Sequence, residues 1–237
     1  MLARDEDVEH GEGGRDEARP PMERLKEGVS AVTQDAGTAS SGNAILEALE
    51  ARHSMPRMHE VLPPRELVAR VLQAAAWAPN HHRTEPWRFF VLAGRAREEL
   101  GQVFAQSLRS RMQDPEATES QAALAKERQK PLRAPVVVVV ATVPSTNPKA
   151  EEIEDIAATA AAVQNVLLAA ESVGLGAMWR TGAPARDPAV KHHLGLPDAA
   201  TIVAFVYLGY PDVPVLRQKQ RRVDQYTAWL GWHADTE

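Results

Sequence analysis

The chain has 237 residues and a mass of 25.9 kDa, and 44% of its residues are hydrophobic, which is enough to bury one substantial core. Residues 1–42 hold ten of the 32 acidic residues and five of the 27 basic residues, so the formal charge of −5 belongs to this segment and the remainder is neutral. A neutral body offers no net basic face, which argues against nucleic acid or an anionic membrane as a partner.

Residues 1–42 are predicted to form a disordered acidic tail. The stretches "GEGGRDEARPP" and "GTASSG" contain too little apolar surface to offset the entropy lost on ordering. No apolar stretch follows the first charges, as a targeting peptide requires, and no later stretch approaches the roughly 18 uninterrupted apolar residues of a membrane span. The chain has no cysteine, which fits a reducing compartment. We therefore expect a cytoplasmic protein with a single domain at 43–237.

The first half of this body predicts three helices and a strand. "NAILEALEARH" (43–53) is amphipathic, with Ser41 or Asn43 available as N-cap. "PPRELVARVLQAAAW" begins with proline and is followed by Pro79, the usual punctuation of a helix. "WRFFVLAG" (87–94) is typical of a strand, and the helical pattern "RAREELGQVFAQSLRSR" follows it.

The second half alternates strands and helices. "VVVVVATV" (136–143) lacks polar alternation, so this strand must be covered on both faces. "EEIEDIAATAAAVQNVLLAAESVG" predicts an alanine-rich helix that can pack closely on more than one side, and "GAMWRTGA" a short strand and turn. "DPAVKHHLGL" reads as a helix capped by Asp187, and "TIVAFVYLGY" as a buried strand. The predicted fold is α/β (α+β), a three-layer sandwich with a central mixed sheet covered by helices on both faces.

Several common catalytic motifs are absent or incomplete. "HEVLP" at His59 lacks the second histidine of a zinc helix, and Pro63 would break that helix, so no metal site is expected. "GLGAMW" has Trp179 where a dinucleotide fingerprint has its third glycine, and the element order is reversed. There is no P-loop and no G-x-S-x-G elbow. No side chain is therefore predicted to act as a catalytic nucleophile.

Four separated segments occur in a recognisable order: "EARHSMPR", "WAPNHHRTEPWRFFV", "GLGAMWRTGA" and "FVYLGYP" followed by "RQKQRR". Each is weakly specific alone. Together, on matching elements, they resemble the nitroreductase family of FMN-dependent oxidoreductases, in particular its small members, and the resemblance covers 44–226. It implies a nitroreductase-like fold, FMN as cofactor and a homodimer with flavin at the interface.

The resemblance also implies which residues contact FMN. Arg52, His53 and Ser54 match the family's phosphate and ribityl motif, and a guanidinium fork with a hydroxyl suits a phosphate. His81 would lie against the flavin bound mainly by the other subunit. The remaining implied contacts are Trp77, Trp179, Arg180, Thr181 and, as a second phosphate arm, Arg221. Each segment has a structural alternative: a polar helix end for Arg52 and His53, a solvated loop at 80–85, a hairpin turn with a core tryptophan at 179–182, and a solvated charge run at Arg221. His82, His192 and His193 are expected at the surface without a role.

Two departures from the family pattern affect the expected site. Many relatives place Lys or Arg two residues after the serine, where a positive charge stabilises the reduced flavin, but this chain has Pro56 there and Arg57 one residue later. Family members without the histidine often show S-x-x-N-x-Q-P-W in the loop, where this chain has Asn80, Arg83 and Glu85. The usual polar contacts to the flavin edge are therefore altered.

The implied reaction depends on the cofactor and not on a catalytic triad. NADH or NADPH would reduce the flavin, and a nitroaromatic or quinone-like acceptor would reoxidise it by a ping-pong mechanism. The alternatives are a flavin-binding protein without turnover and a relative that acts on flavin itself or on a halogenated aromatic compound. The sequence contains no motif that separates NADH from NADPH.

Overall fold

A computed structural model describes residues 41–213 and 222–232, and the described residues from Ile45 onward form one compact unit. The first described helix, α2, spans Ser41–Ala51. Residues 1–40 of the predicted tail and Arg221 lie outside the described residues, so the tail at 1–42 stays a prediction.

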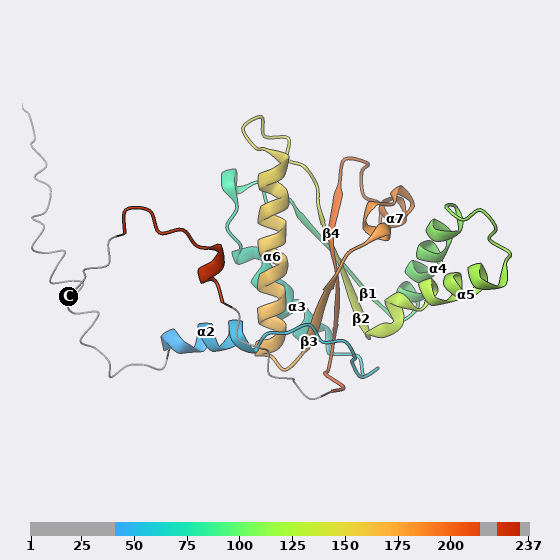
Figure 1. The fold of residues 1–237 in the computed structure, drawn as a ribbon, viewed down its shortest axis with the longest axis horizontal. Helices are drawn as coiled ribbons and strands as arrows, with labels where there is room; N and C mark the ends of the chain where they lie inside the picture. Colours follow the sequence, from blue (N-terminus) through green and yellow to red (C-terminus); the bar gives the residue numbers. More distant parts are fainter. Residues whose placement is uncertain (1–40, 214–221, 233–237) are drawn as a thin grey trace, which may run out of the picture. The chain divides into compact units, whose positions relative to one another are not determined.

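The centre of the unit is a four-stranded sheet in the order β1-β2-β4-β3 (Figure 1). The strands are β1 (Trp87–Ala93), β2 (Val136–Thr142), β3 (Gly176–Arg180) and β4 (Thr201–Gly209), and all their pairings are antiparallel. Every residue of β2 is buried, as the unbroken valine run predicts. In the part of the chain that the structure describes, the parallel component expected of a mixed sheet is confined to a bridge between Ser54 and Ala177.

One face of the sheet is covered by the long helix α6 (Glu152–Ser172) together with α3 (Arg65–Gln73) and the 3-10 turn η1 (Ala74–Trp77) (Figure 1). Alternate residues of β2, namely Val136, Val138 and Val140, point to this face. They pack with apolar residues of α6: Ala162, Val163, Val166 and Ala170. By length and composition alone α6 could cross a membrane. Its buried face instead packs against the sheet as the core helix of a globular unit does.

The opposite face is covered by α4 (Arg95–Arg109), with α5 (Thr118–Arg128), the 3-10 turn η3 (Lys130–Arg133) and α7 (Pro188–His193) beside it. The other alternate residues of β2, Val137 and Val139, pack here with Leu100, Phe104 and Val190. Asp187 caps α7 by accepting a hydrogen bond from the Ala189 N–H at 2.9 Å, as predicted. The expected three-layer sandwich is confirmed.

The remaining described elements are short 3-10 turns: η2 (His81–Arg83), η4 (Ala183–Arg186) and η5 (Asp224–Tyr226). The helix predicted over 63–77 is α-helical only to Gln73 and then tightens into η1. Its C-terminal alanines lack a capping residue, and tertiary packing on α6 sets where the helix ends.

Candidate functional site

The segment that follows α2 lies along the edge strand β3. The Met55 N–H donates to the Ala177 carbonyl at 3.0 Å, and Ser54 forms a parallel bridge with Ala177. Gly176 permits this close approach, because a Cβ there would lie 2.7 Å from Met55 Cγ. The structure thus brings Arg52–Ser54 beside the strand that carries Trp179 and Arg180, which are more than 120 residues later in the chain.

His53 has an unsatisfied ring nitrogen. Its Nδ1 lies 3.0 Å from the Ala51 carbonyl, whereas Nε2 is buried and has no hydrogen-bond partner among the described residues. With Nδ1–H as the donor, Nε2 is an acceptor. A buried polar atom without a partner is uncommon in native structures and points to a missing group, here one that donates a hydrogen bond.

The end of β3 divides its side chains between the two faces of the sheet. The Trp179 indole N–H donates to the Val203 carbonyl at 3.1 Å, and the ring packs on the α6 side. Arg180 lies on the opposite side, in the wall of a cavity of about 270 Å³ that we call the Arg180 cavity. Gly182 follows with φ of 111°, a backbone conformation that favours glycine. Arg180 and Thr181 therefore line a cavity, whereas the partly buried Trp179 packs against the core on the opposite face.

The Arg180 cavity combines an aromatic wall with a positive charge excess. Its lining includes Phe104, Phe205 and Tyr207, the cations Arg111, Lys130 and Arg180, and the single carboxylate of Glu127. Lys130 pairs with Glu127, and Arg111 donates to the Ser107 carbonyl at 3.0 Å. The hydrogen bond that Arg180 Nε makes is to Met178 Sδ at 3.0 Å, a weak acceptor. The guanidinium of Arg180 is thus suited to an anionic or electron-rich ligand.

Burial also changes the pKa of one residue of the aromatic wall, Tyr207. Desolvation raises the pKa of Tyr207 to about 12, and the nearby Arg180 and Arg133 offset this only in part. Tyr207 is therefore a neutral phenol at ordinary pH, able to donate a hydrogen bond.

Pro56 occupies the position at which many relatives have Lys or Arg, and the structure shows which cations lie near it. Pro56 lines a small hollow next to the Arg180 cavity, together with Arg133 and Arg180, while Arg57 lines neither space. Two cations therefore reach the surroundings of Pro56: Arg133 from η3 and Arg180 from β3. The sequence does not mark Arg111, Lys130 and Arg133 as site residues, because Arg111 lies in the turn after α4 and the other two in η3, where no motif spacing identifies them.

The loop at 80–86, which we call the His81 loop, has an unusual backbone. His82, Arg83 and Glu85 have φ of 59°, 51° and 45°, the left-handed region that costs energy for residues other than glycine. Side chains hold this shape: Asn80 Oδ1 accepts from the Glu85 N–H at 2.7 Å, and Thr84 donates to the buried carboxylate of Asp155 at 2.6 Å.

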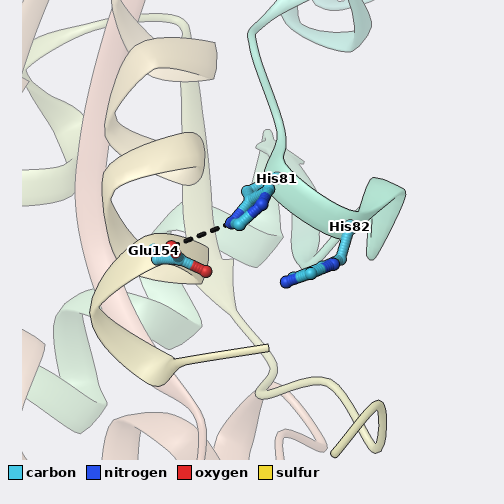
Figure 2. A group of neighbouring side chains, drawn as sticks. All are labelled: His81, His82 and Glu154. Carbon is cyan, nitrogen blue, oxygen red and sulfur yellow. Dashed lines mark hydrogen bonds and ion pairs between the residues drawn. The ribbon is translucent and has the colours of Figure 1, made fainter. Parts of the chain in front are cut away.

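Figure 2 shows how the two histidines of this loop lie against α6. His81 Nδ1 is 2.9 Å from Glu154 Oε1, and the rings of His81 and His82 stack with centroids 3.8 Å apart. The hydrogen bond from His81 lowers the pKa of the Glu154 carboxyl, so this carboxylate is ionised at neutral pH. Trp77, before the loop, is 82% exposed and lines neither the Arg180 cavity nor the hollow at Pro56.

The His81 loop and the Arg52–Ser54 segment lie toward opposite ends of α6 (Figure 1). Glu154, the partner of His81, is in the first turn of this helix, whereas Ala177, the partner of Ser54, follows its C-terminus. From Glu154 to Ser172 the helix rises roughly 27 Å. Within one chain His81 therefore lies far from the Arg52–Ser54 segment.

The fold and this site define a three-layer α/β protein with a cationic cavity at the end of an edge strand. The chain belongs to the Nitroreductase family, whose profile matches residues 49–210. This confirms the family resemblance that the four sequence segments indicate.

Individual relatives agree with this assignment. A protein of Escherichia coli (strain K12) named "Putative NAD(P)H nitroreductase YdjA" is 33% identical over 168 residues, 71% of this chain and 88% of that protein. The structure of a nitroreductase-like family protein from Bacillus cereus has a TM-score of 0.66 and 26% identity, covering 79% of this chain and 96% of that one. The fold is also shared with a Desulfovibrio desulfuricans protein described as "a putative nitroreductase in complex with fmn", with a TM-score of 0.59 and 23% identity, covering 80% of this chain and 98% of that one.

Proposed function

We propose that the protein is an FMN-dependent oxidoreductase that uses NADH or NADPH to reduce nitroaromatic or quinone-like acceptors. The observation that carries this proposal is the pairing of Ser54 with Ala177, because it joins two segments that the family pattern assigns to one flavin. Relatives named as NAD(P)H nitroreductases and a neighbour crystallised with FMN support the same reading.

The residues present fit FMN. Arg52 and Ser54 would hold the phosphate with a charged fork and a hydroxyl. The buried, unpartnered Nε2 of His53 would accept a hydrogen bond from a ribityl hydroxyl. Backbone N–H groups at Thr181 and Gly182, where the positive φ of Gly182 opens the turn, would face the flavin edge. When bound, FMN supplies the hydride chemistry that these side chains do not.

The Arg180 cavity fits a small aromatic acceptor. Its volume of about 270 Å³ lies just below the usual range of ligand pockets, roughly 300–1,000 Å³, which suits a single ring. Lys130 and Arg180 would orient an electron-rich nitro or carbonyl group, and Tyr207 could hydrogen-bond to it. Nicotinamide and acceptor would use this one space in turn, so we expect ping-pong kinetics.

We further propose that each flavin site is built from two chains of a cytoplasmic homodimer. His81 is separated from its own Arg52–Ser54 segment by most of the length of α6, so it is better placed to serve the flavin of a second copy. The two-fold partner would then receive the same contribution in return.

The first test is the cofactor content of the purified full-length protein. We expect a yellow protein that releases one FMN per chain on denaturation. A colourless protein that fails to take up added FMN would contradict the proposal. A protein that binds FMN but is reduced by neither nucleotide would instead be a flavin-binding protein without turnover.

A further inference from the structure

The chain contains two pairs of adjacent histidines, which differ in backbone conformation and in how their rings lie relative to each other. His192 and His193 are successive residues of α7, where side chains diverge by about 100° around the helix axis. His82 has φ of 59° and ψ of 5°, which folds its ring back over that of His81 at a centroid distance of 3.8 Å. The left-handed backbone therefore brings two imidazoles together where a helix separates them.

A carboxylate completes this group from another element. Glu154, in the first turn of α6, lies 2.9 Å from His81 Nδ1 (Figure 2). One ligand atom each from His81, His82 and Glu154 lies within 4.8 Å of the others. Over residues 41–213 and 222–232, no second group of three His, Asp or Glu side chains converges in this way. His192 and Asp198 also form a pair at 3.0 Å, but without a converging second histidine.

This ligand set matches the chemistry of divalent transition metals. Two imidazole nitrogens and one carboxylate oxygen are ligands that Zn²⁺ accepts at about 2.0–2.2 Å. His81 Nδ1 and Glu154 Oε1 are 2.9 Å apart, somewhat less than the roughly 3.4 Å between neighbouring ligands of a tetrahedral ion with these bond lengths. The two side chains would open slightly around an ion, and His82, whose ligand atom lies within 4.8 Å of theirs, would move toward it. The side chains of His81 and Glu154 are 63% and 36% exposed, so an ion and its water can enter.

The surroundings hold the ligands in register. Thr84 and the Ser145 N–H both donate to Asp155, which neighbours Glu154, and this ties the His81 loop to α6. Left-handed residues other than glycine persist only where their surroundings impose them, and they gather at functional sites. Here the strained residue is itself a member of the converging group.

We propose that His81, His82 and Glu154 bind one divalent transition-metal ion, of which Zn²⁺ is the probe, with water in the open position. The ion replaces the proton between His81 Nδ1 and Glu154 and joins the His81 loop to the N-terminal turn of α6. His81 Nε2 stays available as a donor, as the second nitrogen of a metal-bound histidine commonly is. His81 is common to this site and to the flavin proposal. His82 and Glu154 have no role in the flavin proposal, so variants of these two residues test the metal site separately.

The test is Zn²⁺ binding by equilibrium dialysis to the untagged, chelator-treated full-length protein. We expect one ion per chain, at least tenfold weaker binding in His82→Ala and in Glu154→Gln, and a rise in melting temperature with Zn²⁺ that both variants lose. The double variant His192→Ala, His193→Ala is the matched control and should bind like the parent. The proposal is wrong if the parent binds no stoichiometric Zn²⁺, or if folded His82→Ala and Glu154→Gln bind it unchanged. FMN content, measured in parallel, reports on the flavin site separately.

Discussion

Arg52 is the residue through which the proposed phosphate site can be weakened most directly. Removing its guanidinium should weaken FMN binding by about 1.5–3 kcal/mol, the range for a hydrogen bond to a charged group, or roughly 10- to 150-fold in Kd. FMN titration of folded Arg52→Ala protein measures this. Arg57→Ala is the matched control, because Arg57 is exposed and lines neither cavity. Equal FMN affinity in the parent and Arg52→Ala would remove Arg52 from the site.

Tyr207 gives a prediction on pH dependence. Its pKa is raised to about 12 by burial, against an ordinary value of 10.0. The native state therefore holds this proton more tightly than the unfolded chain. Its contribution to the free energy of unfolding is complete below pH 10 and is lost as pH rises toward about 12. Ultraviolet titration of the three tyrosines should show one late phenol, absent in Tyr207→Phe. If the late step survives this substitution, the burial of Tyr207 has been misassigned.

Residues of the candidate site were predictable from the sequence only where they belong to a recognisable motif. Arg52, Ser54, Arg180 and Thr181 occur in short patterns, and the structure brings these patterns together. Lys130 and Arg133 were not predictable, because their approach to the cavity depends on how η3 packs under α4. The contact of His81 Nδ1 with Glu154 Oε1 joins residues 73 positions apart, and neither local sequence shows it.

At the scale of elements, the packing of α4 on α5 depends on Gly101. This residue is buried, and a Cβ there would overlap the carbonyl oxygen of Arg128 at the end of α5. Gly101→Ala should therefore lower the free energy of unfolding by about 1–3 kcal/mol, the cost of overpacking, although alanine is the better helix former. Denaturant unfolding measures the change, with the exposed Gln102→Ala as a control expected within about 0.5 kcal/mol. A stabilised Gly101→Ala protein would show that the two helices separate freely.

The elements themselves were largely predictable from hydrophobic periodicity. The valine run of β2 predicted a strand covered on both faces, and alternate valines do pack against α6 and α4. The end of α3 was less predictable because three alanines carry no capping signal. Helix α5 was not predicted, since its sequence "TESQAALAKER" has few apolar residues, and Leu124 is the one apolar side chain in it that is fully buried. Strand direction was set by tertiary pairing, which periodicity along the chain does not encode.

The length of α6, which separates His81 from Arg52 within one chain, predicts that each flavin site uses residues of two subunits. If His81 serves the flavin held by the partner chain, His81→Ala and Arg52→Ala damage one composite site from opposite chains. Subunit exchange between the two variants should then restore one intact site per heterodimer, with flavin content above that of either variant alone. Exchange is confirmed by mass spectrometry. Should confirmed exchange restore nothing, His81 does not act across the interface.

The proposed function requires the protein to transfer reducing equivalents from a nicotinamide nucleotide through FMN. The most direct measurement is anaerobic stopped-flow absorbance of the FMN-loaded full-length protein mixed with NADH or with NADPH. We predict loss of the visible flavin absorbance with at least one nucleotide, and its return when a nitroaromatic or quinone acceptor is added. Flavin absorbance that persists with both nucleotides would contradict the account.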